Sequence, residues 1–195
     1  MDYNIILQRQ HIENEIKQFL QDFQGQTENL LFKKGLYIYG SSGTGKTYFI
    51  KRILKEMNYD IINYDAGDVR NKALIETITS NNISNRNVLD MLHKKDKKIA
   101  IIMDEIDGMN NGDKGGINAL IKIIRQKKTK KQKAENMTKN PIICIGNYYI
   151  DKKIKELMKV CNVYELKTPT KEQTKKIISL SYPSLNNKYQ TALLN

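Results

Sequence analysis

The sequence predicts an α/β fold in which a five-stranded parallel sheet carries helices on both faces. Five short runs rich in β-branched and aromatic residues recur along the 195-residue chain, and segments with helical periodicity lie between them. Strands that alternate with helices form parallel sheets, because each helical crossover brings the chain back to the same end of the sheet. The length suits one main domain with a sizeable core. We therefore expect a doubly wound sheet.

The elements follow one another in an order that the apolar spacing predicts. A helix over residues 8–23 precedes the first strand, and its apolar residues are Ile12, Ile16, Phe19, Leu20 and Phe23. The segments 50–57 and 117–124 place apolar residues at i, i+3, i+4 and i+7, so each has one apolar helix face. The predicted strands are 36–39, 60–64, 98–103, 141–145 and 162–166. The polar segment 79–87 and the basic segment 125–140 are expected to be loops.

Positive charge is concentrated between Lys122 and Lys139, where eight basic residues accompany one acid, Glu135. This segment holds +7 of the formal net charge of +12. A basic excess favours a polyanionic partner, although a composition rich in Lys, Asn and Ile also arises from an AT-rich genome. Two interpretations of the insert at 127–139 stay open: a contact with DNA or a partner, and a solvated loop.

The cysteines and the N-terminus predict a soluble, intracellular protein. Cys144 and Cys161 form no CxxC pair and are not near either histidine, so neither a disulfide framework nor a zinc site is expected. The first residues lack the basic start and apolar core of a signal peptide, and no apolar run reaches membrane-spanning length.

A phosphate-binding motif follows the first predicted strand. The segment GSSGTGKT at 40–47 fits G-x-x-x-x-G-K-[ST] and stands between a strand and an amphipathic helix. Its glycines let backbone N–H groups and the helix N-terminus face phosphate. Lys46 is expected to neutralise the β- and γ-phosphates of ATP, and the Thr47 hydroxyl to ligate Mg²⁺. The residues predicted to bind nucleotide are Gly40, Ser41, Ser42, Gly43, Thr44, Gly45, Lys46 and Thr47.

Three acids, Asp104, Glu105 and Asp107, follow the apolar run at 98–103. The carboxylates of such a cluster repel one another unless a cation binds them or a reaction uses them. We predict that Asp104 is the second protein anchor of Mg²⁺. Glu105 is expected on the opposite side of a strand-like backbone, where it accepts a proton from an attacking water, and this favours hydrolysis over transfer to a second substrate. The alternative for Glu105 is a solvated acid at a strand end, and Asp107 is expected to cap the next turn or orient a neighbour.

Asn147 follows the fourth predicted strand, PIICI at 141–145. A neutral amide there can hold water or a γ-phosphate oxygen without adding charge, although Asn after a strand is also an ordinary turn former. Together with the two motifs above, it is predicted to be a γ-phosphate sensor. The predicted catalytic residues are thus Glu105, Asn147 and Lys46.

With these motifs the chain resembles the AAA+ ATPases, a branch of the P-loop NTPases, and within them the large subunits of the sliding-clamp loader replication factor C. The segment MDEIDGMNNGDKGGINALIKII (103–124) is similar to the family's Asp-Glu-Val-Asp-Gly-Met segment and its following helix, and YDAGDVRNK (64–72) to its Asn-Ala-Ser-Asp-x-Arg stretch. The resemblance covers roughly residues 30–180. It implies an ATPase subunit of a ring or spiral that binds ATP between neighbours, grips primer–template DNA and opens a clamp.

The resemblance also implies partners and a division of the chain. Residues 1–167 would be the ATPase domain and 168–195 the start of a helical lid or a C-terminal tail, the lid being truncated or absent. Arg70, Lys72 and Lys114 fall where the family's helices face DNA, and exposed surface charge is the equal alternative. Other clamp-loader subunits, a sliding clamp and DNA are the implied partners, in the nucleus or another site of DNA replication.

One departure from the family concerns the arginine finger that small clamp-loader subunits insert into a neighbour's site. Their Ser-Arg-Cys motif is replaced here by Lys159, Val160 and Cys161. Lysine lacks the planar fork of arginine, and valine carries no charge. We therefore expect slow ATP hydrolysis unless a partner supplies an arginine. The alternative functions are a nucleotide-regulated scaffold with little turnover and an AAA+ protein of the helicase-loader type.

Overall fold

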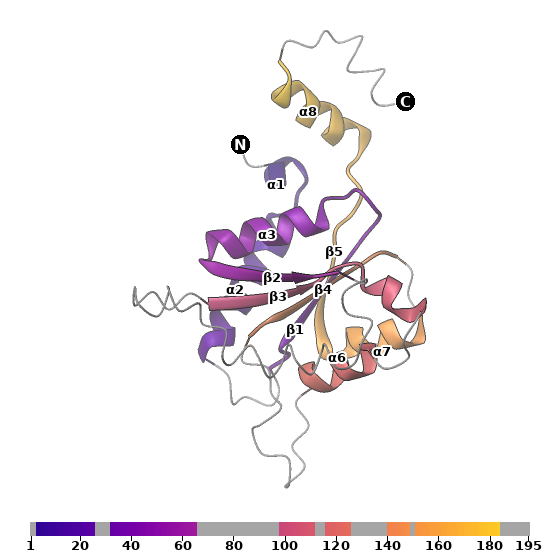
Figure 1. Ribbon diagram of the computed structural model, residues 1–195. Coiled ribbons are helices and arrows are strands. Elements are labelled where there is room, and N and C mark those ends of the chain that lie inside the picture. Colours follow the sequence, from indigo (N-terminus) through magenta and orange to yellow (C-terminus); the bar gives the residue numbers. More distant parts are fainter. Residues whose placement is uncertain are drawn as a thin grey trace, which may run out of the picture.

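A computed structural model describes residues 3–25, 32–65, 98–111, 116–125, 140–148 and 151–183. Five parallel strands, in the order β2-β3-β4-β1-β5, form one sheet with helices on both faces (Figure 1). The strands are β1 (Gly35–Tyr39), β2 (Tyr59–Tyr64), β3 (Lys98–Met103), β4 (Ile142–Gly146) and β5 (Cys161–Glu165). The predicted fold class is confirmed, and each strand lies within one residue of its predicted bounds.

The described helices are α1 (Tyr3–Ile6), α2 (Gln10–Gly25), α3 (Lys46–Glu56), α6 (Gly116–Ile124), α7 (Lys152–Val160) and α8 (Lys171–Ser181), and a 3₁₀ helix, η1 (Ile106–Asn111), follows β3. The prediction of one helix from residue 8 was wrong at its start. Gln8 has φ 54°, a left-handed backbone conformation that a right-handed helix does not contain. The helix is therefore interrupted at Gln8, between α1 and α2.

Alternate side chains of β1 enter two separate cores. Leu36 and Ile38 pack with residues of α2 and α3, while Tyr37 packs on the other face with residues of α6 and α7. All three side chains are fully buried, as expected for a central strand of a parallel sheet. Figure 1 places α3 above the strands and α6 and α7 below them. The loop that follows β1 therefore starts from a strand that is held on both faces.

A buried carboxylate joins the N-terminal helices to α3. Glu13 of α2 accepts hydrogen bonds from Asn4 of α1 (2.7 Å), from Lys17 (2.7 Å) and from Arg52 of α3 (2.6 Å). Burial by itself would raise the pKa of Glu13, but these hydrogen bonds and the charge of Arg52 outweigh it and lower the pKa. Because a buried charge is stable only with partners, the network holds α1, α2 and α3 in one arrangement.

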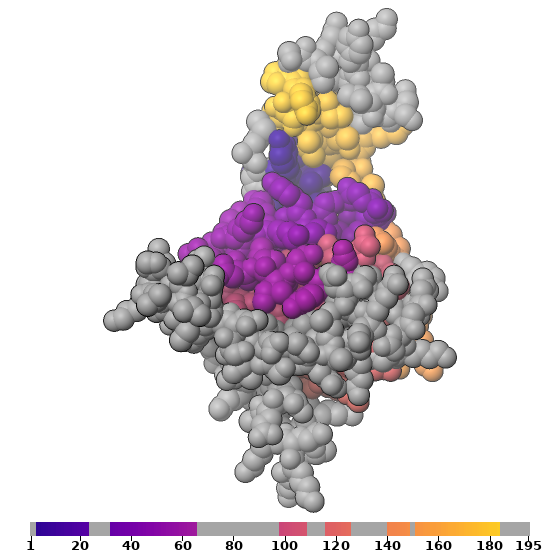
Figure 2. All heavy atoms as spheres, viewed as in Figure 1, coloured from indigo at the N-terminus to yellow at the C-terminus, as the bar shows by residue number. Residues whose placement is uncertain are grey.

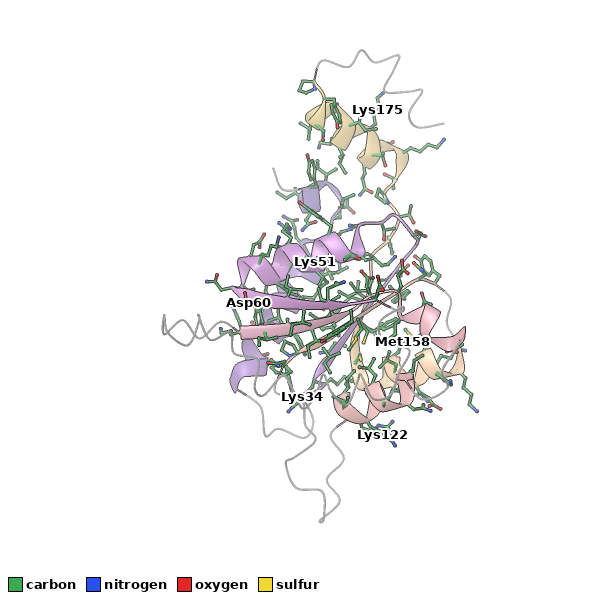
Figure 3. All side chains as sticks on the ribbon, in the orientation of Figure 1. Lys34, Lys51, Asp60, Lys122, Met158 and Lys175 are labelled. Atoms are coloured by element: carbon green, nitrogen blue, oxygen red, sulfur yellow. The ribbon has the colours of Figure 1, made fainter. Side chains whose placement is uncertain are left out.

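Helix α8 lies over α1, outside the layers that cover the sheet (Figure 2). The Gln173 side-chain amide donates to the Ile6 carbonyl (3.0 Å), and the hydroxyls of Tyr3 and Ser181 hydrogen bond at 3.1 Å. No side chain of α8 is buried, and Lys175 on this helix lies far from the sheet (Figure 3). Polar contacts rather than a shared core thus place α8. Within the described part of the chain, no helix combines the length and apolar composition needed to cross a bilayer.

Gly35 provides a test of the packing around β1. A Cβ at this position would lie 2.8 Å from Cys161 Sγ and 2.9 Å from Ile124 Cγ2. We expect Gly35→Ala to lower the free energy of unfolding by about 1–3 kcal/mol, because it forces a methyl group into a packed core. Urea denaturation measures the change. In the Gly35→Ala/Cys161→Ala double variant the loss should be smaller than the sum of the single losses, and strict additivity would show that the thiol is not the obstacle.

Candidate nucleotide-binding site

Two glycines shape the loop between β1 and α3. A Cβ on Gly40 would lie 2.3 Å from the Leu166 carbonyl oxygen, so the loop can begin beside the segment after β5 only without a side chain. Gly45 has φ 80° and forms the N-cap of α3, a left-handed conformation that glycine adopts without strain. The first turn of α3 is thereby placed with its free N–H groups at the end of the loop.

A cavity of about 370 Å³ lies at the carboxyl ends of β1, β3 and β4. The strand order brings these ends together although they are far apart in sequence, and such edges are where open α/β sheets bind ligands. The cavity is lined by Ser42, Gly43, Gly45, Lys46, Thr47, Tyr48, Asp104, Glu105, Ile145, Gly146 and Asn147. All predicted catalytic and metal-binding residues are among them. Tyr48, Ile145 and Gly146 were not predicted.

Three residues of the predicted phosphate loop do not line the cavity. The carbonyl oxygens of Gly40 and Ser41 both accept hydrogen bonds from Lys46. Thr44 is buried, and its hydroxyl donates to the Ser41 carbonyl (3.0 Å). These residues hold the shape of the loop in this structure, while Ser42, Gly43 and Gly45 border the cavity.

Lys46 is the central cation of the site. Its side chain is buried, and Nζ donates to the carbonyls of Gly40 (2.9 Å) and Ser41 (2.8 Å) and to Asn147 Oδ1 (3.1 Å). Burial lowers the pKa of Lys46, and the nearby carboxylate of Asp104 opposes this shift. The three acceptors replace the water that the ammonium group has lost. Lys46 therefore joins the phosphate loop to the residue after β4.

Thr47 and Asp104 form a pair of hard oxygen donors. The Thr47 hydroxyl donates to Asp104 Oδ2 at 2.7 Å, across the gap between α3 and the end of β3. The described residues contain no group of three or more His, Cys, Asp or Glu side chains that could hold a metal by themselves. A hydroxyl and one carboxylate fit Mg²⁺, which keeps several waters and takes its remaining ligands from substrate phosphates.

Glu105 does not continue the strand, and the prediction of a strand-like backbone at this residue was wrong. β3 ends at Met103, and Glu105 has φ 51°, in the left-handed region. Its backbone N–H donates to Asp104 Oδ1 (3.0 Å), and its carbonyl accepts from Gly108 N–H (2.9 Å) as η1 begins. The turn, rather than strand alternation, separates the two acids. Glu105 is exposed and lines the cavity beside Asp104.

Asp107 orients a neighbour, which was one of its two predicted roles. Its Oδ2 accepts a hydrogen bond from the backbone N–H of Asn147 at 2.5 Å. Burial raises the pKa of Asp107 above its ordinary value, although this hydrogen bond and the charge of Lys46 act in the opposite direction. Asn147 is thus held from two sides, by Asp107 at its backbone and by Lys46 at its side chain.

Arg9 supports the phosphate loop, although it does not line the cavity and the sequence did not indicate this role. Its buried guanidinium donates to the carbonyl of Thr44 in the phosphate loop (3.0 Å) and to the carbonyl of Lys167 after β5 (3.1 Å). A second link joins the same segments, because the Thr168 hydroxyl donates to the Ser41 hydroxyl at 3.1 Å. A single arginine near the N-terminus fits no motif, and its two partners are distant in sequence.

The predicted DNA contacts lie outside the described residues: Arg70, Lys72, Lys114 and the insert at 127–139. Lys159 and Val160, which stand where the resemblance placed an arginine finger, form the end of α7. Lys159 is exposed, whereas Val160 packs against the core below the sheet.

Residues 36–168 match the family described as "ATPase family associated with various cellular activities (AAA)". This match covers the phosphate loop, the acids after β3 and Asn147. The chain belongs to the AAA family. An AAA ATPase domain accounts for the nucleotide chemistry that the cavity residues predict.

Curated AAA relatives confirm the resemblance to replication factor C large subunits. Replication factor C subunit 1 of Drosophila melanogaster is 31% identical over 157 residues, which span 77% of this chain and 15% of the fly protein. The human protein of the same name is 31% identical over 159 residues, spanning 78% of this chain and 13% of its own. The replication factor C large subunit of Methanococcus aeolicus is 28% identical over 154 residues, which span 78% of this chain and 29% of the archaeal protein. The chain thus matches less than a third of the length of these relatives.

A solved structure supports the fold. The Aeropyrum pernix ORC2 protein, determined in ADPNP and ADP complexes, superposes with a TM-score of 0.60 over 92% of this chain and 53% of that protein. Sequence identity is 13%, so this likeness concerns the fold alone.

Lys46→Ala tests whether the cavity binds nucleotide through this cation. We expect the affinity for ATP to fall roughly 10- to 100-fold, because charge-assisted hydrogen bonds to phosphate are lost. Titration with a fluorescent ATP analogue measures the change. Lys51→Ala, on the same helix but outside the cavity lining, is the matched control. Equal affinities of the Lys46→Ala and Lys51→Ala variants would remove Lys46 from the site.

Proposed function

We propose that this chain is an ATP-binding and ATP-hydrolysing subunit of a clamp-loader-like assembly, which loads a sliding clamp on primer–template DNA during replication. The observation that carries the ATPase part is the convergence of Lys46, the Thr47–Asp104 pair, Glu105 and Asn147 on one cavity. The clamp-loader part is supported by the 28–31% identity to replication factor C large subunits.

The contacts of Lys46 and Asn147 suggest how ATP enters. Asn147 Oδ1 is one of three acceptors for Lys46 Nζ. A phosphate oxygen carries more negative charge than an amide oxygen, so it replaces Asn147 as a partner of Lys46. The Asn147 amide is then free to meet the γ-phosphate. In this proposal Asn147 reports the γ-phosphate because its freed amide binds a γ-phosphate oxygen, which ADP lacks.

Hydrolysis follows from the remaining residues. Thr47 and Asp104 would hold Mg²⁺, which neutralises charge on the β- and γ-phosphates. A water oxygen attacks the γ-phosphorus, the bond from that phosphorus to the β–γ bridging oxygen breaks, and the proton of the water passes to the Glu105 carboxylate. ADP leaves with the bridging oxygen. Glu105 is exposed, and proton release to solvent follows readily.

The wider assignments rest on the resemblance. We infer that residues 1–167 form the ATPase domain and that 168–195 begin a lid or tail, since α8 has no buried side chain and contacts α1 through polar groups. Companion AAA+ subunits, a sliding clamp and DNA are the proposed partners, at the site of DNA replication. Arg70, Lys72 and Lys114 are proposed to face DNA.

The absence of an arginine at 159–161 supports an asymmetric place in the assembly. Val160 is packed against the core and cannot act on a neighbouring site, and Lys159 offers a point charge instead of a planar fork. We propose that a different subunit donates an arginine to this site and that this chain donates none in return.

Glu105→Gln separates turnover from binding. The variant should bind ATP as the parent does, while hydrolysis falls about 10²- to 10⁴-fold because the amide cannot accept the proton of the water. Steady-state phosphate release in the assembled complex measures turnover. Glu156→Gln, at an exposed position of α7, is the control. Parental turnover by Glu105→Gln would end the general-base assignment and favour the solvated-acid reading of Glu105.

The proposed asymmetry predicts how turnover depends on concentration. The pure chain should hydrolyse ATP slowly at every concentration, and co-purified companion subunits should raise the rate by roughly 10³- to 10⁵-fold, the contribution of an arginine finger. Phosphate release over a wide range of chain concentration, with and without these subunits, is the measurement. A steep, cooperative rise with the pure chain would mean that the chain completes its own site as a homo-oligomer.

A further inference from the structure

Asp107 contacts Asn147, the proposed γ-phosphate sensor, at the backbone of Asn147 rather than at its side chain. Its Oδ2 accepts from the N–H of Asn147, the first residue beyond β4. The Asn147 side chain in turn accepts from Lys46. One carboxylate from η1 therefore fixes the main chain of the residue whose amide reaches into the cavity.

Tyr37 and Gly146 lie next to the hydrogen bond between Asp107 and Asn147. A Cβ on Gly146 would lie 2.4 Å from the Tyr37 hydroxyl oxygen and 2.8 Å from Asp107 Oδ1. The hydroxyl and the carboxylate thus occupy the space that a side chain at residue 146 would need, directly before Asn147. Tyr37 is fully buried on β1, the strand next to β4, so it cannot withdraw. The chain can therefore pass between Asp107 and Tyr37 at this point only with a glycine.

Tyr37 and Asp107 each carry a buried polar atom with no hydrogen-bond partner among the described protein atoms. These atoms are the Tyr37 hydroxyl oxygen and Asp107 Oδ1. Burial raises the pKa of both groups, and the charge of Asp107 raises that of Tyr37 further. The contact that Asp107 makes with another element is its hydrogen bond to Asn147, the residue after β4.

We propose that Asp107 is a positioning residue that aims the Asn147 amide at the γ-phosphate, so that the site distinguishes ATP from ADP. The inference rests on the proposed function, because it assumes that ATP occupies the cavity. Asp107 does not touch the nucleotide. It acts through the backbone N–H of Asn147, and a displaced N–H changes where the amide side chain starts.

The test compares the affinities of a fluorescent non-hydrolysable ATP analogue and a fluorescent ADP, because binding does not depend on turnover. In Asp107→Ala the preference for the ATP analogue should fall about tenfold while ADP affinity stays within about twofold, as expected when one hydrogen bond that acts only through the γ-phosphate is lost. Asp22→Ala, at a half-buried position of α2 outside the cavity lining, is the matched control. An unchanged preference in Asp107→Ala overturns the inference.

Two further variants separate geometry from charge and remain informative if Asp107→Ala does not fold. Asp107→Asn keeps an oxygen that can accept from the Asn147 N–H and should retain the preference. Asp107→Glu keeps the charge, but its side chain is one methylene longer and the space beside Gly146 is already filled. This variant should lose the preference for the ATP analogue. The opposite pattern would mean that Asp107 acts by its charge on Lys46 and would overturn the inference.

A double variant tests the route of action. In an Asn147→Ala background, Asp107→Ala should reduce the preference no further, because its effect passes through Asn147. Additive losses would overturn the inference. A parent chain that binds neither nucleotide would instead refute the proposed function, and a parent that binds both equally would show that Asn147 senses no γ-phosphate.

Discussion

The hydrogen bonds of the buried Lys46 ammonium group are the interaction on which the candidate site depends. They join the carbonyls of Gly40 and Ser41 in the phosphate loop to the side chain of Asn147 after β4. A buried ammonium group without partners would be costly, so these acceptors set the spacing between loop and strand end. Phosphate oxygens are acceptors of the same kind. In the proposed function, nucleotide binding would exchange the partners of an existing cation, and the Thr47–Asp104 pair would hold Mg²⁺.

The sheet order makes this meeting possible. β1 lies between β4 and β5, and β3 lies beside β4, so the loops after β1, β3 and β4 share one edge. The segment after β5 reaches the same edge, where the Thr168 hydroxyl bonds to Ser41 and the Lys167 carbonyl accepts from Arg9. Arg9 also holds Thr44, and the segment leads into α8. The phosphate loop is thus joined by hydrogen bonds to the segment that leads into α8.

Local patterns predicted the elements better than their ends. The strands were found because β-branched runs recur between amphipathic segments, but the strand bounds moved by one residue at several ends. Gln8 and Glu105 both adopt positive φ although neither is glycine, and no sequence rule marks such residues. Consequently the predicted start of the helix at residue 8 and the predicted strand-like backbone at Glu105 were wrong. The role of Glu105 in the cavity did not need a strand, because the turn at this residue also places the acid beside Asp104.

The sequence by itself determined the α/β class, the phosphate loop and the cavity residues Lys46, Thr47, Asp104, Glu105 and Asn147. These depend on short-range patterns, since apolar periodicity and motif spacing are properties of neighbouring residues. Only the tertiary structure decided which strands are adjacent, and hence that one carboxylate of η1 holds the residue after β4 and that an N-terminal arginine holds the phosphate loop. Such contacts join residues far apart in the chain, and the physical reason for them, burial that forces each polar group to find a partner, exists only once the chain has folded.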